Sequence, residues 1–295
     1  MATIEIGTET VKTGRRTVSQ TAAFRLRVIW SLTFLMLLAL VVLYPLWEIV
    51  RISLLHRSEV ILPDASIWPL DLSAYQRIVD GLSFPRYFLN SLIVTTTVTA
   101  GNTMTAILAA YAFSRASFRG RDVLFLIVIG TLMIPNHITL IPNYLTFASF
   151  DMLDTYVCLI LPFLASGFAV FFLRQHMMTI PKSLDEAARI DGASSWKILW
   201  DIVVPLSLPA ISVVALFTFM SNWNEFIWPL LATTSDDMRT VQIGLRFLLR
   251  EEGEGDSPDW PLVMAGTMIT LTPLLLAYVI AERHLIRGIT MGSLK

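Results

Sequence analysis

Long apolar runs alternate with shorter polar segments along this 295-residue chain. A helix that crosses a bilayer needs about 20 mostly apolar residues, because each residue advances it by about 1.5 Å. Six runs approach this length, and each is predicted to form one transmembrane helix. The predicted helices are residues 28–50, 88–113, 123–145, 156–173, 206–229 and 263–281. The expected fold class is therefore an all-α integral membrane protein.

The distribution of Lys and Arg predicts which segments face the cytoplasm. With the N-terminus inside, the inner segments hold 15 of these residues and the outer segments 7, and positive charge normally accumulates on the cytoplasmic side. We expect a cytoplasmic tail over residues 1–27, a six-helix domain over 28–287 and a cytoplasmic tail over 288–295. The first apolar run is long enough to span, so we expect it to be retained rather than cleaved as a signal peptide.

Composition narrows the chemistry. Hydrophobic residues make up 55% of the chain and charged residues 15%, against about 25% charged residues in a soluble domain. A net charge of −1 offers no basic surface for nucleic acid. The single cysteine, Cys158, excludes an internal disulfide and any multi-thiolate metal site. The four histidines lie far apart and form no metal-binding pair at helical spacing.

Residues 181–205 carry the most specific local pattern. Ser183, followed three residues later by Glu186, fits a capping box and predicts that a helix starts there. Gly192 is placed to end this helix in the left-handed conformation. Residues 194–201 predict a second short helix, closed by Pro205. The segment is therefore expected to form a helix–turn–helix at the membrane surface.

Composition alone leaves two interpretations of this loop open. Ala187, Ala188 and Gly192 present little bulk, so a partner surface can approach the backbone closely. Its groove would be filled by Ile190, Trp196 and Leu199. The alternative is a helix that merely lies on the lipid headgroups.

The succession Glu186-Ala187-Ala188, Gly192, Ile202 and Pro205 resembles the signature (EAA) loop of permease subunits of binding-protein-dependent ABC importers. Val204 departs from the family, which usually has Leu there, but the change is conservative. The resemblance extends over roughly residues 28–295. It is strongest to the carbohydrate-uptake branch, in particular maltose-type second permeases and glycerol-3-phosphate-type permeases. The further stretches that carry it are residues 132–135, 152–154, 223–229 and 287–290.

The resemblance implies that the loop is a coupling helix, which docks in a cleft on an ATPase subunit. Glu186 and Gly192 match the key positions of that coupling helix in the family. Glu186 also fits as the capping partner of Ser183, and both roles can hold together. The implied location is the bacterial cytoplasmic (inner) membrane. The implied partners are a second homologous permease, two copies of an ATP-binding subunit and an extracytoplasmic solute-binding protein. The implied coupling residues are Glu186, Ala187, Ala188, Asp191, Gly192, Ile202 and Pro205.

The chain itself is not expected to hydrolyse ATP. No segment matches the phosphate-binding pattern of Gly, four residues, Gly-Lys and Ser/Thr, and none of the four lysines follows a glycine. We expect ATP and Mg²⁺ to bind the partner ATPase subunits and this chain to bind no cofactor. No nucleophile–base pair indicates an enzyme.

Polar groups at membrane depth usually face a cavity or another helix. Asn102 lies in the second predicted span, Asn136 and His137 in the third. Asn222, Glu225 and Phe226 lie near the end of the fifth. We take all six residues as candidates for the solute pathway. If the fifth helix continues, these last three share one face. Amides and carboxylates bind sugar hydroxyls, and an aromatic ring covers the apolar face of a sugar.

Each candidate has a structural alternative. Asn102 is of the type that hydrogen-bonds between packed helices. Trp223 and Trp228 fit an outer aromatic belt that anchors the fifth helix in the interface. The acidic run from Glu251 to Asp259 is expected to be a solvated outer loop.

The expected function is that of a permease subunit for a sugar or polyol derivative, such as an oligosaccharide, a glycoside or a glycerol-phosphate-like solute. The lack of Lys and Arg in the predicted spans favours a neutral sugar. The alternative is a secondary transporter or channel subunit that is not coupled to ATP, which would need a coupling-ion site deep within a span.

Overall fold

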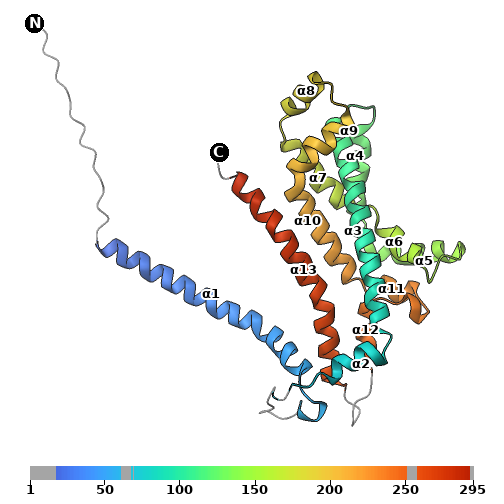
Figure 1. Cartoon of the computed structure of the whole chain (residues 1–295). Coiled ribbons are helices and arrows are strands. Elements are labelled where there is room, and N and C mark those ends of the chain that lie inside the picture. The colour runs from blue at the N-terminus through green and yellow to red at the C-terminus, as the bar shows by residue number, and fades with distance from the viewer. Residues whose placement is uncertain (1–17, 61–67, 69, 251–257, 293–295) are drawn as a thin grey trace, which may run out of the picture. The chain divides into compact units, whose positions relative to one another are not determined.

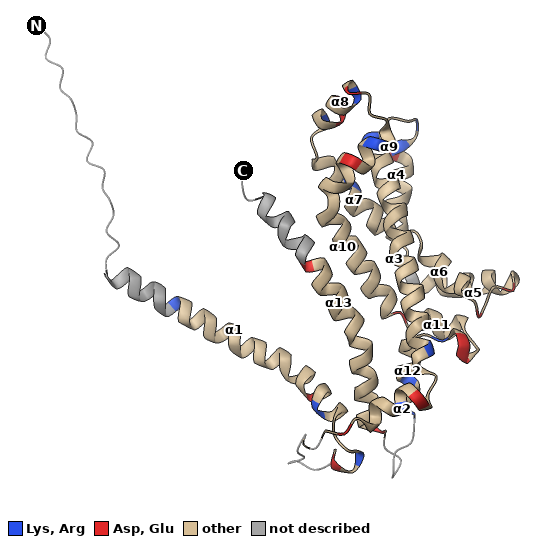
Figure 2. Ribbon diagram, in the orientation of Figure 1, with Lys and Arg blue, Asp and Glu red and all other residues tan. Residues whose placement is uncertain are grey.

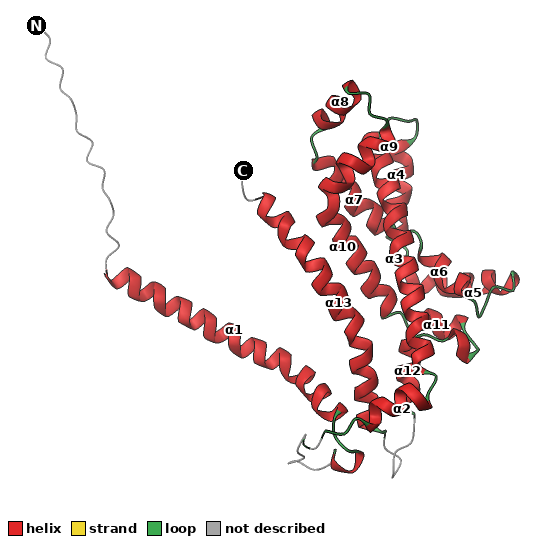
Figure 3. Cartoon of the chain, viewed as in Figure 1, coloured by secondary structure: helices red, strands yellow, loops and turns green. Residues whose placement is uncertain are grey.

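The computed structural model of this chain describes residues 18–60, 68, 70–250 and 258–292, and every element in these ranges is a helix (Figures 1 and 3). The long helices are α1 (Val18–Ser53), α3 (Phe84–Arg115), α10 (Val204–Trp223) and α13 (Trp260–Gly292). The shorter α-helices are α2 (Ser73–Gly81), α4 (Arg121–Thr131), α5 (Leu140–Ser149), α6 (Tyr156–Ile160), α7 (Gly167–Thr179), α8 (Lys182–Ile190), α9 (Ser195–Ile198), α11 (Ile227–Ala232) and α12 (Val241–Leu248). Single turns are the 3-10 segments η1 (Arg57–Glu59), η2 (Asn136–Thr139), η3 (Leu161–Phe163) and η5 (Asp236–Met238), and the π-helical turn η4 (Leu199–Val203).

The chain divides into two units, Met1–Ile49 and Val50–Lys295. In the first unit, α1 exposes its apolar side chains from Val28 to Trp47, as a helix made to lie in lipid does. It begins at Val18, ten residues before the predicted start at residue 28. Helix-favouring residues such as Ala22 let the helix extend beyond the apolar run.

Four helices of the described chain are long and apolar enough to cross a membrane: Arg27–Ser53, Phe84–Arg115, Ser195–Trp223 and Trp260–Glu282. A fifth candidate is the pair Tyr156–Phe163 and Gly167–Thr179, which is bent by 41°. The first, second and sixth predicted spans therefore each lie within one helix. The other three predicted spans differ from the structure.

The third predicted span, residues 123–145, is not one helix. α4 ends at Thr131, the backbone at Pro135 is extended, and α5 starts only at Leu140. Pro135 has no N–H and disfavours a helical conformation at the residue before it, so α4 cannot continue. Pro142 is tolerated because it lies in the first turn of α5.

The fourth predicted span, residues 156–173, is a bent pair. α6 is followed by η3, and Ser166 then caps α7 by accepting the N–H of Ala169 at 3.3 Å. Because this cap starts a new helix, the axis bends between α6 and α7. α7 then continues to Thr179, beyond the predicted end.

The fifth predicted span, residues 206–229, is shifted. Its helix begins at Ser195 and ends at Trp223. The side-chain amides of Asn222 and Asn224 donate to backbone carbonyls four residues earlier, both at 2.9 Å. Such side chains compete for backbone groups and favour helix ends over helix interiors.

Within the second unit, α3 packs along α7 and α10, and α10 also packs along α13 (Figure 1). One apolar core lies near α9 and includes Ile107, Leu173 and Val203. A second core is formed around Trp223 by residues of α2, α12 and α13. A third contains Trp228 and the buried Cys158.

Charged residues gather at the two ends of the second unit. Figure 2 shows them around α8 and α9 at one end and around α2 and α12 at the other, with uncharged stretches of α3, α10 and α13 between them. α10 contains no charged residue, and α3 has only Arg86 and Arg115, near its ends. This distribution suits a unit whose middle lies in an apolar slab.

Candidate functional site

The 181–205 loop contains the predicted helix–turn–helix, but α8 starts earlier than expected. It begins at Lys182 after Pro181, and in the described chain no side chain caps its first turn. Ser183 lies inside the helix, so the predicted capping box is wrong. The φ of Pro181 is fixed near the helical value, which lets the helix start beside it. Glu186 is exposed, so its carboxylate is accessible to a partner.

Gly192 ends α8 as predicted, with φ at +81°. Its N–H donates to the carbonyl of Arg189 at 3.0 Å, and the N–H of Ala193 donates to the carbonyl of Ala188 at 2.9 Å. These two bonds form a Schellman motif. A Cβ built at Gly192 would meet no atom of the described chain within 4 Å. The left-handed backbone, and not crowding within this chain, calls for glycine here.

The tip of the loop exposes large apolar side chains beside small ones. Ile190 is 88% exposed and Trp196 is 62% exposed. Leu199 is 1% exposed and belongs to the apolar core near α9, so its prediction as a groove-filling residue is wrong. Ala187 and Asp191 are exposed as well, and Ala188 is half-buried. Figure 1 shows α8 at one extremity of the second unit. Clustered exposed apolar side chains outside a membrane mark surfaces that other proteins cover.

Pro205 does not close the second short helix, contrary to the prediction. α9 continues through η4, which contains Ile202, into α10, whose first turn holds Pro205. The N–H of Val204 donates to the carbonyl of Leu199, five residues earlier. This wider turn accommodates the prolyl ring without ending the helix.

A cavity of about 760 Å³ lies beside α10. Its walls come from α3, the end of α4, η2, α5, the break between α6 and α7, the last turns of α10 and the start of α11. Four of the predicted pathway residues line it, namely Asn102, His137, Asn222 and Glu225. Asn136 belongs to η2, but its side chain is outside the described part. Phe226 is not a lining residue, and its ring faces the Arg246 guanidinium at 5.7 Å.

Asn102 mainly holds one wall of the cavity. Its side chain is almost fully buried, and Nδ2 donates to the carbonyl of Phe163 at 2.9 Å. The hydroxyl of Thr105 donates to the carbonyl of Leu164 at 2.7 Å. Both bonds join α3 to the break between α6 and α7. Asn102 therefore has the structural role predicted as its alternative, a hydrogen bond between packed helical segments.

Asn222 and Glu225 do not share a face of one continuing helix, because α10 ends at Trp223. Instead, Glu225 Oε1 accepts the N–H of Trp228 at 3.0 Å and so caps α11. Both side chains nevertheless line the same cavity. The end of α10 between them therefore changes the relative position of Asn222 and Glu225 but leaves both side chains at the same cavity.

Part of the polar lining was missed from the sequence. Thr218 and Ser221 of α10 line the cavity with Asn222 and Glu225. Thr218, Ser221 and Asn222 follow the spacing i, i+3 and i+4 of one face of α10, a signal that the sequence contains. Aromatic rings complete the wall, from Phe163, Phe168, Phe217 and Trp228.

The outer aromatic belt is the wrong interpretation of Trp223 and Trp228. The two side chains are 1% and 2% exposed. The indole N–H of Trp223 donates to the carbonyl of Thr270 at 3.1 Å, and that of Trp228 to the carbonyl of Cys158 at 2.8 Å. Both rings are core residues of this chain and do not anchor it in the interface.

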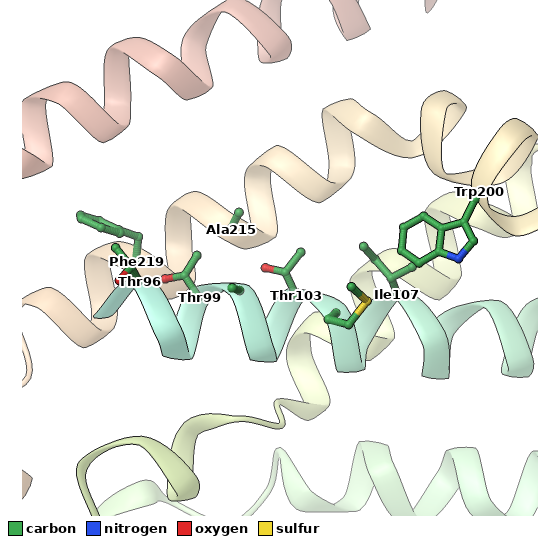
Figure 4. A pocket seen from close by; sticks show the side chains of 9 residues that line it. Thr96, Thr99, Thr103, Ile107, Trp200, Ala215 and Phe219 are labelled. Carbon is green, nitrogen blue, oxygen red and sulfur yellow. The ribbon is translucent and has the colours of Figure 1, made fainter. Parts of the chain in front are cut away.

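A second, smaller hollow of about 360 Å³ lies between α3 and α10 (Figure 4). Thr96, Thr99 and Thr103 line it from α3, opposite Ala215 and Phe219 of α10. Apart from the threonines its lining is apolar, so it lacks the convergent polar groups of a sugar site.

Asp154 fastens the loop before α6 to the segment after α11. Its carboxylate accepts the N–H groups of Thr234 and Ser235 at 3.0 and 3.2 Å. Partial burial works to raise the pKa of Asp154, but the hydrogen bonds from Ser235 and Thr234 together hold that pKa below its ordinary value.

The prediction that the acidic run is solvated is wrong for Asp259, the last residue of that run. Residues 251–257 lie outside the described ranges. Asp259 is 2% exposed. Its Oδ2 accepts Nη1 of Arg77 at 2.6 Å, and its Oδ1 accepts the N–H of Leu262 at 3.3 Å. Asp259 thus caps α13 and joins it to α2.

Comparisons with known proteins place the chain in a family. The family model described as the inner membrane component of binding-protein-dependent transport systems matches residues 101–290. The arabinooligosaccharides transport system permease protein AraQ of Halalkalibacterium halodurans is 31% identical, over 90% of this chain and 96% of AraQ. The sn-glycerol-3-phosphate transport system permease protein UgpE of Escherichia coli is 34% identical, over 88% of this chain and 95% of UgpE.

Two solved structures share the fold. A chain of a bacterial ABC transporter involved in the import of the acidic polysaccharide alginate superposes with a TM-score of 0.78 at 23% identity, covering 92% of this chain and 99% of that one. A chain of the alginate transporter in complex with its periplasmic protein gives 0.63 at 15% identity, covering 89% of this chain and 95% of that one. Because the family model matches residues 101–290 and both curated relatives exceed 30% identity over most of their length, the chain belongs to the family of inner-membrane components of binding-protein-dependent transport systems.

Proposed function

We propose that this chain forms half of the translocation pathway of an ATP-driven importer for a sugar or polyol derivative. The other half is a second, homologous permease. Two ATP-binding subunits bind ATP and Mg²⁺, and an extracytoplasmic binding protein delivers the solute. The observation that carries the proposal is the polar cavity in a chain of this family, with α8 exposed at one end of the same unit.

The proposed topology has six crossings of the inner membrane with both termini in the cytoplasm. The four long helices and the bent pair supply five of them. The remaining crossing is α4 followed by η2 and α5, interrupted at Pro135. The excess of Lys and Arg in the predicted inner segments supports a cytoplasmic position for α8 and α9.

The proposed coupling surface is the exposed side of the 181–205 loop. Closure of two ATPase subunits moves rigid bodies, and a short docked helix transmits such a displacement. Glu186 and Ile190 are exposed on α8 for that contact. This assignment replaces the alternative of an ATP-independent secondary transporter or channel, which the family membership does not support.

The lining of the cavity favours a neutral solute. Among the described residues that line it there is no Lys or Arg, and Glu225 supplies a carboxylate. The relatives are named for arabinooligosaccharides and for sn-glycerol 3-phosphate. A carboxylate repels a phosphate or uronate group, whereas amides, hydroxyls and aromatic rings suit sugar hydroxyls and ring faces. We therefore favour an oligosaccharide or glycoside over a glycerol-phosphate-like solute.

The solute class is tested on the binding protein that copurifies with this chain. Its melting temperature is measured with L-arabinose oligosaccharides, maltose oligosaccharides, sn-glycerol 3-phosphate and alginate oligosaccharides. We expect a neutral oligosaccharide to raise it, because a ligand that binds only the folded state stabilises that state. A shift with the anionic solutes alone would contradict the neutral assignment.

The pathway role of two side chains is tested by uptake at a limiting concentration of the solute so identified. In Asn222→Ala and in Glu225→Gln we expect uptake to fall about three- to tenfold, the value of one or two hydrogen bonds. Asn224→Ala is the matched control, since Asn224 is an exposed amide of the same turn that does not line the cavity. Unchanged uptake in both test variants would remove these residues from the pathway.

A further inference from the structure

Two buried charges join the proposed coupling loop to α3. Arg115 is the last residue of α3, and Asp185 lies in the first turn of α8. Arg115 Nε lies 3.1 Å from Asp185 Oδ2, and the two side chains are 3% and 9% exposed. Arg115 Nη2 also donates to the carbonyl of Ile180 at 3.1 Å, just before α8.

The second short helix of the loop, α9, also contacts α3. The hydroxyl of Tyr111, one turn before the end of α3, donates to the carbonyl of Ser195 at 3.0 Å. Ser195 is the first residue of α9. The last turns of α3 thus contact both α8 and α9.

The Arg115–Asp185 pair has little value as a stabilising contact. Removing two charges from water costs about as much as their attraction returns, and apolar residues of similar volume often replace such a pair without loss. Asp185 Oδ1 is buried and has no hydrogen-bond partner among the described residues, so the pair is also incompletely satisfied. What the pair does supply is a fixed position of α8 relative to α3.

The same helix also holds the cavity wall. Asn102 and Thr105 of α3 donate to the carbonyls of Phe163 and Leu164, in the break between α6 and α7. These contacts lie roughly 15 to 20 Å along α3 from Arg115, at about 1.5 Å per residue. One helix therefore contacts the loop at one end and the cavity wall farther along.

We propose that the Arg115–Asp185 pair is the positioning contact that passes movement of α8 into α3 and through it to the cavity wall. The inference rests on the proposed function, in which α8 is seated on an ATPase subunit. A helix held at two points moves as one body, so displacement of α8 shifts the segment at Phe163 and Leu164. Neither Arg115 nor Asp185 touches solute or nucleotide in this scheme.

The test variant replaces both charges, Arg115→Met with Asp185→Leu, because a single change leaves one buried charge without its counter-ion. It is made in a background of Ala165→Cys and Cys158→Ala, where Ala165 is an exposed cavity residue next to Leu164. The permease is purified with its copurifying partner subunits in nanodiscs. The rate at which a water-soluble maleimide modifies Cys at position 165 is measured without nucleotide and with ATP plus vanadate, and ATP hydrolysis is followed in parallel.

In the parent we expect ATP to change the modification rate. In the double variant we expect ATP hydrolysis to persist while this ATP-dependent change shrinks roughly two- to thirtyfold, the scale on which coupling contacts act. A merely structural role would lower both readings together. Arg115→Lys, which keeps a cation opposite Asp185, should retain most of the change. The control is Arg121→Met with Asp122→Leu, an exposed pair at 3.0 Å, which should leave the change intact.

Two outcomes would overturn the inference. If the double variant keeps the full ATP-dependent change, movement reaches the cavity without this pair, and the proposed function stands alone. If the parent itself shows no ATP-dependent change, the chain is not an ATP-driven gate, and both proposals fall.

Discussion

Gly192→Asp is expected to leave the protein in the membrane and to abolish transport. The backbone at Gly192 has φ at +81°, and a side chain added there meets no atom of the described chain within 4 Å. The variant therefore costs this chain about 1 kcal/mol of backbone strain, which does not unfold it. In the proposed complex, however, the added carboxylate projects into the docking surface between α8 and the ATPase subunit.

The measurement is ATP-dependent uptake by the assembled importer, with copurification of the ATPase subunit as the second reading. Gly120→Asp is the matched control. Gly120 also has positive φ, at +83°, and also has open space around its added Cβ, but it lies before α4 and outside the coupling loop. We expect Gly120→Asp to transport normally. A Gly192→Asp protein that still binds its ATPase and transports like the parent would refute the docking of α8.

Trp228→Ala is expected to destabilise the permease by about 3–5 kcal/mol, as removal of a buried tryptophan usually does. The side chain is 2% exposed, contacts Phe147 at 5.9 Å between ring centroids, and bonds to the carbonyl of Cys158. Its loss opens a void between α5, α6 and α11, at the wall of the cavity. Thermal unfolding of the detergent-solubilised permease measures the effect.

Two further variants separate packing from hydrogen bonding at this position. Trp228→Phe keeps most of the packing and loses one hydrogen bond, so we expect about 1 kcal/mol of destabilisation. Trp196→Ala, at a side chain that is 62% exposed, should leave the melting temperature unchanged. If Trp228→Ala has the same melting temperature as the parent, Trp228 is not a core residue. The side chain would then belong to an outer aromatic belt.

The sequence predicted the helical class and three of the spans because apolar run length alone decides them. It also predicted Gly192 as a helix end, since a left-handed residue after a run such as Glu186 to Ile190 has a local chemical signal. These features depend on neighbouring residues in the chain, and the structure agrees with them.

The errors arose where contacts between distant segments decide the outcome. The burial of Trp223 depends on a carbonyl of α13 and that of Trp228 on a carbonyl of α6, neither of which a local pattern can show. A proline usually ends a helix, but the π-helical turn before Pro205 lets the helix continue through it. The Arg115–Asp185 pair links residues far apart in the sequence, and spacing gave no sign of it.

The pathway candidates show both situations. The polar stripe on α10 is present in the sequence as a helical repeat. The enclosure of His137 and Asn102 in the same cavity requires the break between α6 and α7 and the turn after Pro135. A single sequence supplied the residue types, and packing supplied their proximity.

Reconstitution into liposomes tests most directly the claim that this chain is a passive gate driven from outside. The permease pair is incorporated with and without its ATPase subunits, and this chain is incorporated alone in parallel. The solute identified on the binding protein is followed with ATP on the ATPase side. The account predicts accumulation only when the ATPase subunits, the binding protein and ATP are all present. Solute transport by this chain in liposomes that contain no other protein would contradict it.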